Sequence, residues 1–277
     1  MGHKKSFSPF KGAAMRILLT NDDGIHARGL YALVKELQSI AEIYVASPDR
    51  ERSGTGHSIT VFDPIKVMPT SISGASGAWI VGGTPVDCVK LAISRLVKQP
   101  VDLVVSGVNH GPNLGTDVLY SGTVSAAAEG VIMGVPAIAV SLDDYQAEMN
   151  TAFAALFTRN LIRTVMRQGM DNSTLINVNI PALSPEQIKG IRITRLGTRN
   201  YDNLFEERRD PRGNTYYWMG GGVVQETQQS DSDVAAVEQG FISITPIHLD
   251  LTDYALMEKY RITFSRYLEF FSRGDKT

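Results

Sequence analysis

Residues 16–47 have the sequence RILLTNDDGIHARGLYALVKELQSIAEIYVAS, and this stretch indicates the fold class. Residues 16–20 predict a short strand, and residues 43–47 predict a second strand that ends at Pro48. A helix between them is predicted from four apolar residues at the spacing i, i+3, i+4 and i+7, namely Leu30, Leu33, Val34 and Leu37. A strand, a helix and a strand in this order form a βαβ unit, whose two strands pair in parallel.

The same alternation of strands and helices continues along the chain. Further strands are predicted at residues 62–68, 78–81, 101–105, 136–140, 175–180 and 241–244. Further helices are predicted at residues 84–97, 121–133 and 153–166, and a last helix carries the apolar stripe Met257, Tyr260, Phe264, Tyr267 and Phe271. The run at 101–105 is apolar almost throughout, as expected for a strand that is covered on both faces. We therefore predict a three-layer, Rossmann-like α/β fold with a mostly parallel sheet.

Composition distinguishes a main body from several appended segments. Residues 1–14 are polar, lack apolar periodicity and are predicted to form a flexible tail. Residues 15–277 are predicted to form a single α/β domain, with residues 241–277 as its carboxyl-terminal segment. Residues 199–222 combine charge, glycine and aromatic rings, and they predict a protruding hairpin arm. Because aromatic residues and arginine are enriched at interfaces, we expect the arm to reach a second subunit, with a flap over the chain's own active site as the alternative.

The composition also excludes several classes of protein. The formal charge of −2 over 277 residues generates no field that would attract a nucleic-acid polymer. The amino-terminal stretch lacks the apolar run of a signal peptide, and the most apolar stretch, residues 130–142, falls short of the ~18 residues that span a membrane. We therefore expect a cytoplasmic protein with no membrane partner. Cys88, the one cysteine, lies in an apolar helical pattern and is interpreted as a core residue.

Polar residues follow several predicted strands at the point where each strand ends. The tetrapeptide NDDG at residues 21–24 places two carboxylates side by side, and these repel each other unless a cation or protons compensate them. An Asx turn that caps the next helix is the alternative interpretation. Residues 47–58 and 106–115 form polar loops after later strands, and residues 121–123 open a helix whose exposed N–H groups suit a phosphate. Because ligands of such sheets bind beyond the carboxyl ends of the strands, these loops together predict a metal and phosphoryl site.

Motifs of other enzyme classes are absent from the sequence. It contains no Walker A motif, no HExxH and no G-x-S-x-G elbow. Residues 54–59 begin like a dinucleotide fingerprint, but they lack its third glycine and do not follow the first strand. The five histidines show no zinc-ligand spacing. His57 and His110 lie in the polar loops, where a role near the phosphate stays open.

Five longer blocks of sequence make the chain recognisable. They are ILLTNDDGIHARG at 17–29, SPDRERSGTGHSIT at 47–60, GTPVDCVKLA at 83–92, VDLVVSGVNHGPNLGTDVLYSGTVSAAAEG at 101–130 and GFISITPIHLDLT at 240–252. From Met15 to beyond Asp250 the chain resembles the survival protein E (SurE) family of nucleotidases. Long blocks in the family's order are far more specific than any single motif among them.

The resemblance implies a metal-dependent phosphatase that hydrolyses nucleoside 5′- and 3′-monophosphates to nucleoside and phosphate, with short polyphosphate as a further substrate. It implies one divalent metal ion, Mg²⁺ or Mn²⁺ with Ca²⁺ as a substitute in crystals, and its ligands are Asp22, Asp23, Ser53 and Asn109. The resemblance also implies which residues take part in catalysis, namely Asp22, Asp23 and Asn109. A phosphate site is implied at Asn109 and at the turn of Ser121, Gly122 and Thr123. Family members form homodimers or homotetramers through carboxyl-terminal exchange and hairpin contacts.

Chemistry and resemblance together predict the mechanism. A cation offsets the charge that develops on the phosphoryl group and lowers the pKa of water, which is the expected nucleophile. Either aspartate can assist its deprotonation, and the sequence does not select one of them. An aspartyl-phosphate intermediate is the rival mechanism, disfavoured because two carboxylates that bind metal leave no obvious nucleophile. Hydrolysis of other phosphomonoesters and nucleotide binding without turnover are the alternative functions.

Overall fold

The structure, a computed structural model, describes residues 15–144, 150–202, 205–224 and 229–272, with the side chains of 266 and 268–272 left out. The predicted tail at residues 1–14 and the side chain of Phe271 lie outside these residues. The chain separates into two compact units, Met1–Ile247 and His248–Thr277, which are described in turn. The division into a tail, one domain and appended segments stays a prediction.

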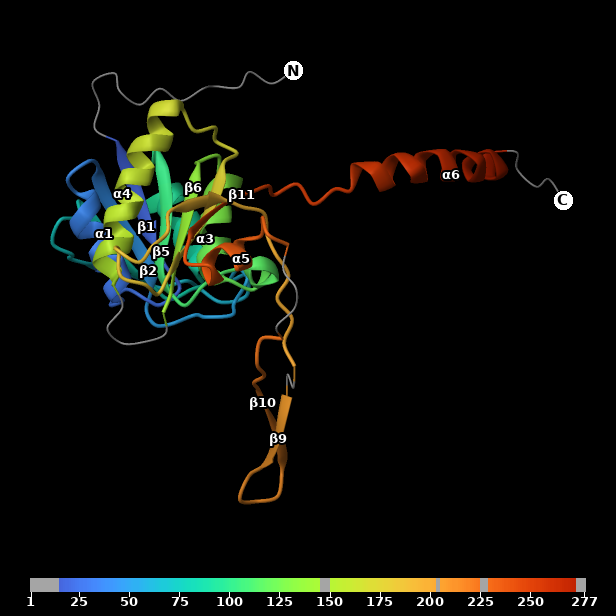
Figure 1. Cartoon of the computed structure of the whole chain (residues 1–277), viewed down its shortest axis with the longest axis horizontal. Helices are drawn as coiled ribbons and strands as arrows, with labels where there is room; N and C mark the ends of the chain where they lie inside the picture. Colours follow the sequence, from blue (N-terminus) through green and yellow to red (C-terminus); the bar gives the residue numbers. More distant parts are fainter. Residues whose placement is uncertain (1–14, 145–149, 203–204, 225–228, 273–277) are drawn as a thin grey trace. The chain divides into compact units, whose positions relative to one another are not determined.

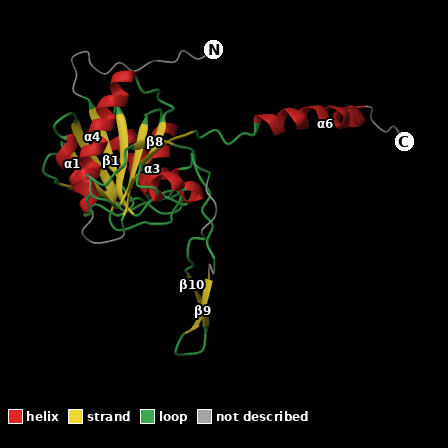
Figure 2. Cartoon of the chain, in the orientation of Figure 1, coloured by secondary structure: helices red, strands yellow, loops and turns green. Residues whose placement is uncertain are grey.

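The first unit is built on a nine-stranded sheet in the order β3-β4-β2-β1-β5-β6-β7-β11-β8 (Figures 1 and 2). The strands are β1 Arg16–Thr20, β2 Glu42–Pro48, β3 Val67–Thr70, β4 Gly77–Val81, β5 Leu103–His110, β6 Ala137–Asp143, β7 Leu175–Pro181, β8 Ile191–Ile193 and β11 Ile242–Ile247. Neighbours from β4 to β7 pair in parallel, whereas β3 is antiparallel to β4 and β11 is antiparallel to β7. The sheet is therefore mostly parallel, as predicted.

Helices cover both faces of this sheet and complete three layers. They are α1 Arg28–Leu37, α2 Pro85–Leu91, α3 Gly122–Ile132, α4 Thr151–Gln168 and α5 Asp233–Glu238, with a π-helical turn at Ala92–Leu96 and a 3-10 turn at Gly115–Leu119. Figure 1 shows α1 and α4 on one side of the strands and α3 on the other. The predicted three-layer α/β fold is confirmed.

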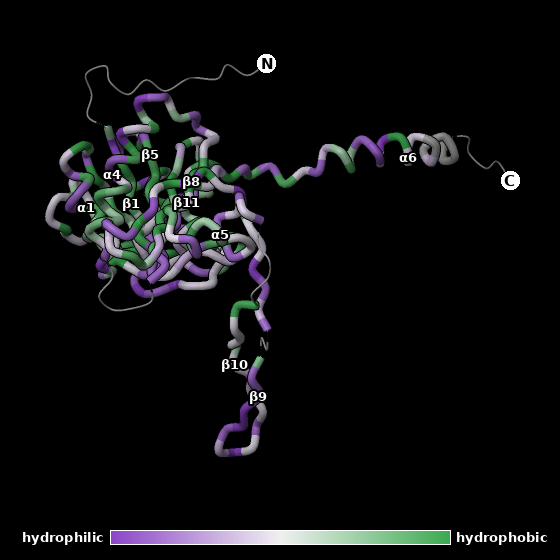
Figure 3. The backbone as a smooth tube through the Cα atoms, in the orientation of Figure 1, coloured by the Kyte–Doolittle hydropathy of each residue, from purple (hydrophilic) through white to green (hydrophobic). Residues whose placement is uncertain are grey.

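The core follows from the apolar periodicity of the sequence. Successive residues of β1 point to opposite faces, so Ile17 and Leu19 pack with α1 and α4, whereas Leu18 packs with α2 and α3. All four residues of the predicted stripe on α1 are buried. Cys88 is fully buried on α2, and this burial raises the pKa of its thiol well above the usual value, which agrees with a core residue. The central strands are among the most hydrophobic segments of the tube in Figure 3.

Two strand predictions were wrong in their extent. The strand expected at residues 62–68 begins only at Val67, because residues 62–66 form a surface loop in which Phe62 is 99% exposed. The strand expected at residues 101–105 is β5, which starts at Leu103 and continues to His110. The polar SGVN residues thus belong to a strand and not to a loop. A run of apolar residues predicts the buried centre of a strand. It does not predict a polar end of the same strand that extends to a binding site.

The predicted arm contains a hairpin of β9 Phe205–Arg209 and β10 Thr215–Met219. Its turn is closed by Asp210, which accepts a hydrogen bond from Asn214 Nδ2 at 2.9 Å. The side chains of Tyr216, Tyr217 and Trp218 are 41%, 59% and 59% exposed. The hairpin prediction is confirmed, and an isolated two-stranded hairpin with such exposed rings is only marginally stable by itself.

The second unit contains α6 Tyr254–Ser272, which confirms the predicted terminal helix. Its apolar stripe is solvent-exposed at the described positions Met257, Tyr260, Phe264 and Tyr267. Phe264 makes edge contacts with the rings of Tyr260 and Tyr267 along the helix. No helix within the described ranges is long and apolar enough to cross a membrane.

Candidate active site

The paired aspartates follow β1 at the carboxyl edge of the sheet, where ligands of open α/β sheets bind. Asn21 fixes the turn that carries them, because its Nδ2 donates to Gly24 O at 3.0 Å and its Oδ1 accepts from the hydroxyl of Ser47. The turn does not cap α1, since the residue that precedes this helix is Ala27 and no side chain caps it. The alternative interpretation of NDDG as a helix cap is therefore not supported.

Asp22 is buried against the first turn of α3. The hydroxyl of Thr123 donates to Asp22 Oδ1, so a residue 101 positions away orients this carboxylate. Gly122 allows the close approach, because a Cβ atom there would lie 2.8 Å from Asp22 Cβ. Burial raises the pKa of Asp22, and the hydrogen bond from Thr123 lowers it by a smaller amount.

Asp23 lies beside Asp22 but is less buried. Its Oδ2 accepts a hydrogen bond from the backbone N–H of His110 at 3.3 Å. Burial and, second, the charge of Asp22 raise the pKa of Asp23 to about 7. Two adjacent carboxylates with raised pKa values form a site where a bound cation would favour both charged forms.

Asn109 lies on β5, the strand that pairs directly with β1. It is 8% exposed, and its Nδ2 donates to Gly111 O at 2.8 Å. This bond fixes the amide so that its carbonyl oxygen faces away from Gly111. A neutral amide oxygen of this kind is a usual ligand of hard divalent cations.

Ser53 belongs to the long loop between β2 and β3. Its side chain is exposed, and its hydroxyl donates to Glu51 Oε1 at 2.7 Å. The preceding residue is close to the aspartates, because the N–H of Arg52 donates to Asp22 O at 2.7 Å. The structure thus joins the Ser53 loop to the aspartate turn through the backbone and directs the Ser53 hydroxyl to Glu51.

Two carboxylates that the sequence reasoning missed anchor this loop. Glu129 on α3 is 2% exposed, and its two oxygens lie 3.0 Å from His57 Nε2 and 2.7 Å from Lys90 Nζ. Asp87 on α2 accepts bonds from Thr60 N at 3.1 Å and Thr60 Oγ1 at 2.6 Å. The sequence did offer a signal for Glu129, since it is an acidic residue within the otherwise apolar helical segment AAAEGV. A carboxylate buried in such a helix requires a charged or polar partner.

The predicted phosphate turn begins α3. Ser121 is its N-cap, and the hydroxyl oxygen accepts from Val124 N at 3.0 Å. The Thr123 side chain contacts Asp22, so in this structure it supports a predicted metal ligand. The amino-terminal end of α3 carries the partial positive charge of a helix terminus and faces this edge of the sheet.

The structure therefore brings Thr123 into contact with Asp22 and the backbone of His110 into contact with Asp23, and it places Asn109 on the adjacent strand. Among the residues that the structure describes, no group of three or more histidine, cysteine, aspartate and glutamate side chains could hold a metal ion. The predicted ligand set includes only two residues of these types and completes its oxygens with an amide and a hydroxyl. Oxygen ligands of this kind suit a hard divalent cation.

Comparisons with known proteins identify the family. The model of the family described as survival protein SurE matches residues 17–203. The chain belongs to the SurE family. It is 67% identical over 261 residues to the 5′-nucleotidase SurE of Syntrophomonas wolfei, which covers 94% of this chain and 99% of that one. The 5′-nucleotidase SurE of Heliobacterium modesticaldum is 52% identical over 246 residues, which are 88% of this chain and 90% of the relative.

The SurE fold is also shared with a solved structure. The crystal structure of the SurE protein from Aquifex aeolicus superposes with a TM-score of 0.77 at 40% identity, over 92% of this chain and 99% of that one. The resemblance inferred from the sequence blocks is confirmed. The predicted enzyme class agrees with the names of the curated SurE relatives, since a 5′-nucleotidase is a phosphoric monoester hydrolase.

Proposed function

We propose that the protein hydrolyses nucleoside 5′-monophosphates, and also 3′-monophosphates, to nucleoside and inorganic phosphate, with short polyphosphate as a further substrate. The observation that carries the proposal is the pair Asp22 and Asp23 at the end of β1, with Asp22 seated on the first turn of α3. This arrangement supports the proposal because two carboxylates, which suit a cation, lie beside a helix terminus at which an anion is favoured. The names of the SurE relatives supply the substrate class.

The residues present suit one divalent ion, Mg²⁺ or Mn²⁺. Asp22, Asp23, Ser53 and Asn109 would hold it, since all four offer oxygen atoms. When bound, such an ion supplies positive charge that offsets the charge on the transferred phosphoryl group and makes water more acidic. The raised pKa values of the two aspartates support this assignment, because adjacent buried carboxylates are otherwise stabilised by protonation.

The remaining roles belong to side chains and backbone of this chain. Thr123 orients Asp22 through its hydroxyl, and the Asn109 amide is fixed by Gly111. The amino-terminal N–H groups of α3, with the Ser121–Gly122–Thr123 turn, would bind phosphate oxygens. Asp23 is the more exposed aspartate and therefore the one that a water molecule can reach.

Phosphate release is the direct test. Purified protein is assayed with AMP after EDTA treatment and after addition of Mg²⁺ or Mn²⁺, alongside phosphoserine and a sugar phosphate. We expect release from AMP that requires the added metal and is lost in Asp22→Asn. A preference for phosphoserine or the sugar phosphate would favour a general phosphomonoesterase. AMP binding without any phosphate release would favour a nucleotide-binding module.

We further propose that the protein is a homodimer or a pair of dimers, assembled through the arm and α6. The exposed rings of Tyr216, Tyr217 and Trp218, together with the exposed stripe of α6, support this proposal because such surfaces are typical of interfaces. Replacing the three arm residues by serine should lower the mass in light scattering. Phe62→Ser, at an exposed ring outside the arm, is the matched control. An unchanged mass with lost activity would identify the arm as a flap.

A further inference from the structure

Residues 197–202, which we call the root of the arm, are bound to the 3-10 turn that precedes the predicted phosphate turn. Thr116 holds the backbone of Arg199, because its Oγ1 donates to Arg199 O at 2.7 Å and accepts from Arg199 N at 3.2 Å. Asp117 holds side chains of the root, because its Oδ2 accepts from Arg199 Nη1 at 2.9 Å and from the Tyr201 hydroxyl at 2.6 Å. Two consecutive residues of the 3-10 turn are thus bound to the root by four hydrogen bonds.

A buried carboxylate holds the same junction from a third element. Asp233 begins α5 and is fully buried. Its Oδ2 accepts from Gly115 N at 2.9 Å, and its Oδ1 accepts from Gly197 N at 2.8 Å. Gly115 and Gly197 also approach each other closely, since a Cβ atom on Gly115 would lie 2.8 Å from Gly197 O. The root and the 3-10 turn therefore separate only if hydrogen bonds to a buried carboxylate break, which is costly.

The 3-10 turn connects this junction to the start of α3. Asp117 O accepts from the N–H of Tyr120 at 3.0 Å and from the N–H of Ser121, the N-cap of α3, at 3.1 Å. The side chain of Asp117 thus binds the root, whereas its carbonyl group holds the first residue of the predicted phosphate turn. Because the side chains of Asp117 and Arg199 are only 17% and 14% exposed, solvent ions screen their attraction little. A shift of the root would be transmitted to Ser121 through one residue.

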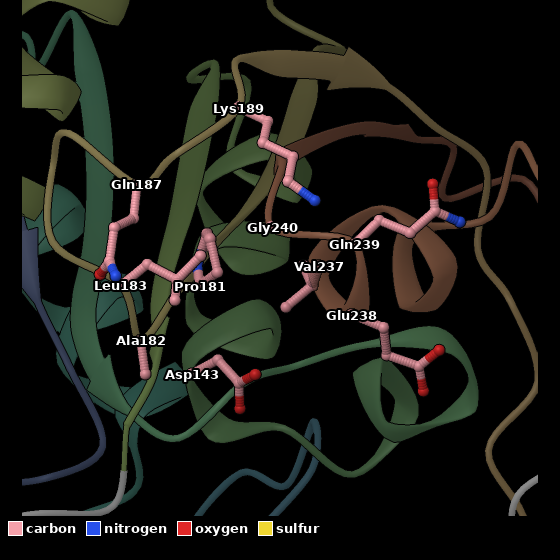
Figure 4. Close-up of a pocket in the computed structure, with 10 residues that line it drawn as sticks. All are labelled: Asp143, Pro181, Ala182, Leu183, Gln187, Lys189, Val237, Glu238, Gln239 and Gly240. Carbon is pink, nitrogen blue, oxygen red and sulfur yellow. The ribbon is translucent and has the colours of Figure 1, made fainter.

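Arg199 also lies near a second carboxylate. Burial raises the pKa of Asp143, and the charge of Arg199 lowers it by a smaller amount. Asp143 is in the wall of a cavity of about 470 Å³ at the carboxyl ends of β6 and β7, with Val237 of α5 in the same wall (Figure 4). A change at Arg199 therefore acts on two carboxylates. Tyr201, whose hydroxyl binds Asp117, provides the more selective test.

We propose that Arg199 and Tyr201 are positioning residues for the phosphate turn, which they hold in place through Asp117. The inference rests on the proposed nucleotidase function and gives the arm a role besides its proposed part in assembly. Loss of either side chain loosens Asp117, so that the N–H groups at the start of α3 are less well aligned with an anion. Affinity for phosphate should fall. Metal binding should not, because β1 and β5 carry the aspartate pair and Asn109.

The test measures inhibition by inorganic phosphate, the product, and KM for AMP at saturating Mn²⁺. Tyr201→Phe removes one hydroxyl and should raise the phosphate inhibition constant and KM about threefold, a change in the range of one net hydrogen bond. Arg199→Ala should raise both about tenfold, and Arg199→Lys should recover part of this loss because it keeps the charge without the forked geometry. In each variant kcat should change less than about twofold.

Two matched controls lie away from the phosphate turn. Tyr44→Phe removes a hydroxyl that donates to Glu42 Oε1 at 2.7 Å, and Arg159→Ala removes a guanidinium that pairs with Glu36 at 2.8 Å. They repeat the two chemical changes at sites that are not part of the root. Both should leave the phosphate inhibition constant at the wild-type value.

Calorimetric titrations of Mn²⁺, and of inorganic phosphate into the Mn²⁺-loaded protein, separate positioning from other effects, with light scattering to follow the mass. Weaker phosphate binding at unchanged Mn²⁺ affinity and mass would support the proposal. Wild-type phosphate binding in both Tyr201→Phe and Arg199→Ala, an equal loss of Mn²⁺ affinity, or a fall in mass that accompanies the loss would overturn it. A wild type that releases no phosphate from AMP would instead refute the proposed function, and the phosphate titration would still test the role of the root.

Discussion

Replacing Gly122 by alanine tests whether the close approach of Asp22 to the first turn of α3 determines activity. A Cβ atom on residue 122 would lie 2.8 Å from Asp22 Cβ and 2.9 Å from Asp22 Oδ2. Ordinary contact begins at 3.4 Å, so the two groups must separate by about 0.6 Å, which is 3.4 minus 2.8. Since a misplacement of about 1 Å can lower a rate about 100-fold, we expect kcat/KM to fall at least about tenfold.

The same helix provides a matched control. A Cβ atom on Gly130 would meet Val104 Cγ2 at 2.8 Å, which is the same degree of overlap but against an apolar side chain of the core. Both changes replace a helical glycine by alanine, so the gain in helix propensity acts in the same direction. We expect Gly130→Ala to lower Tm and to keep kcat/KM per folded molecule, whereas Gly122→Ala changes activity more than Tm.

The assay is phosphate release from AMP at saturating Mn²⁺, with Tm from differential scanning calorimetry. Calorimetric titration of Mn²⁺ into the metal-free protein adds a direct measurement, because a displaced Asp22 should also weaken metal binding. If Gly122→Ala retains both the wild-type kcat/KM and the wild-type metal affinity, the contact between α3 and Asp22 has no role in the site. The argument from steric approach would then be refuted.

Three further changes test the site from other directions. Asp22→Asn and Asp23→Asn should each abolish phosphate release while circular dichroism shows an intact fold. Near wild-type rates with intact metal dependence in both variants would show that the two aspartates do not form the active site. In the metal-free protein the pKa of Asp23 is raised from 3.8 to about 7. Between these pH values the folded state therefore binds more protons than the unfolded state. The free energy of unfolding should fall as the pH rises through this window. Urea unfolding in EDTA at pH 5 and pH 8 should show this fall, and Asp23→Asn should reduce it; an unchanged pH dependence in the variant would contradict the assignment. Glu129→Gln removes the carboxylate that contacts His57 and should loosen the loop that carries Ser53. We expect Mn²⁺ binding to weaken about tenfold, an effect usual for residues that position metal ligands. Wild-type Mn²⁺ affinity would mean that other bonds hold the loop.

Local sequence determined the elements with clear periodicity. The strand Arg16–Thr20 and the apolar stripe of α1 follow from residues a few positions apart, and the structure has both as predicted. The start of α2 was also predictable from the sequence, because the fixed backbone angle of its proline suits the first turn of a helix. The position of Asp22 and Asp23 at a ligand-binding edge also followed from sequence, since they come directly after a strand of a βαβ unit.

Tertiary structure decided what depends on residues far apart in the chain. The hydrogen bond from Thr123 to Asp22 joins residues 101 positions apart, and the contact of His57 with Glu129 joins residues 72 positions apart. No local sequence pattern predicts either contact. Sequence suggested that Thr123 contacts phosphate, whereas its hydroxyl is directed to a carboxylate once α3 packs against the sheet. The cavity lined by Asp143, Pro181 and Val237 likewise combines residues of β6, β7 and α5, which lie far apart in the chain. Hydrophobic periodicity reports which face of an element is buried, but the partner of each polar group depends on which elements meet at the edge of the sheet.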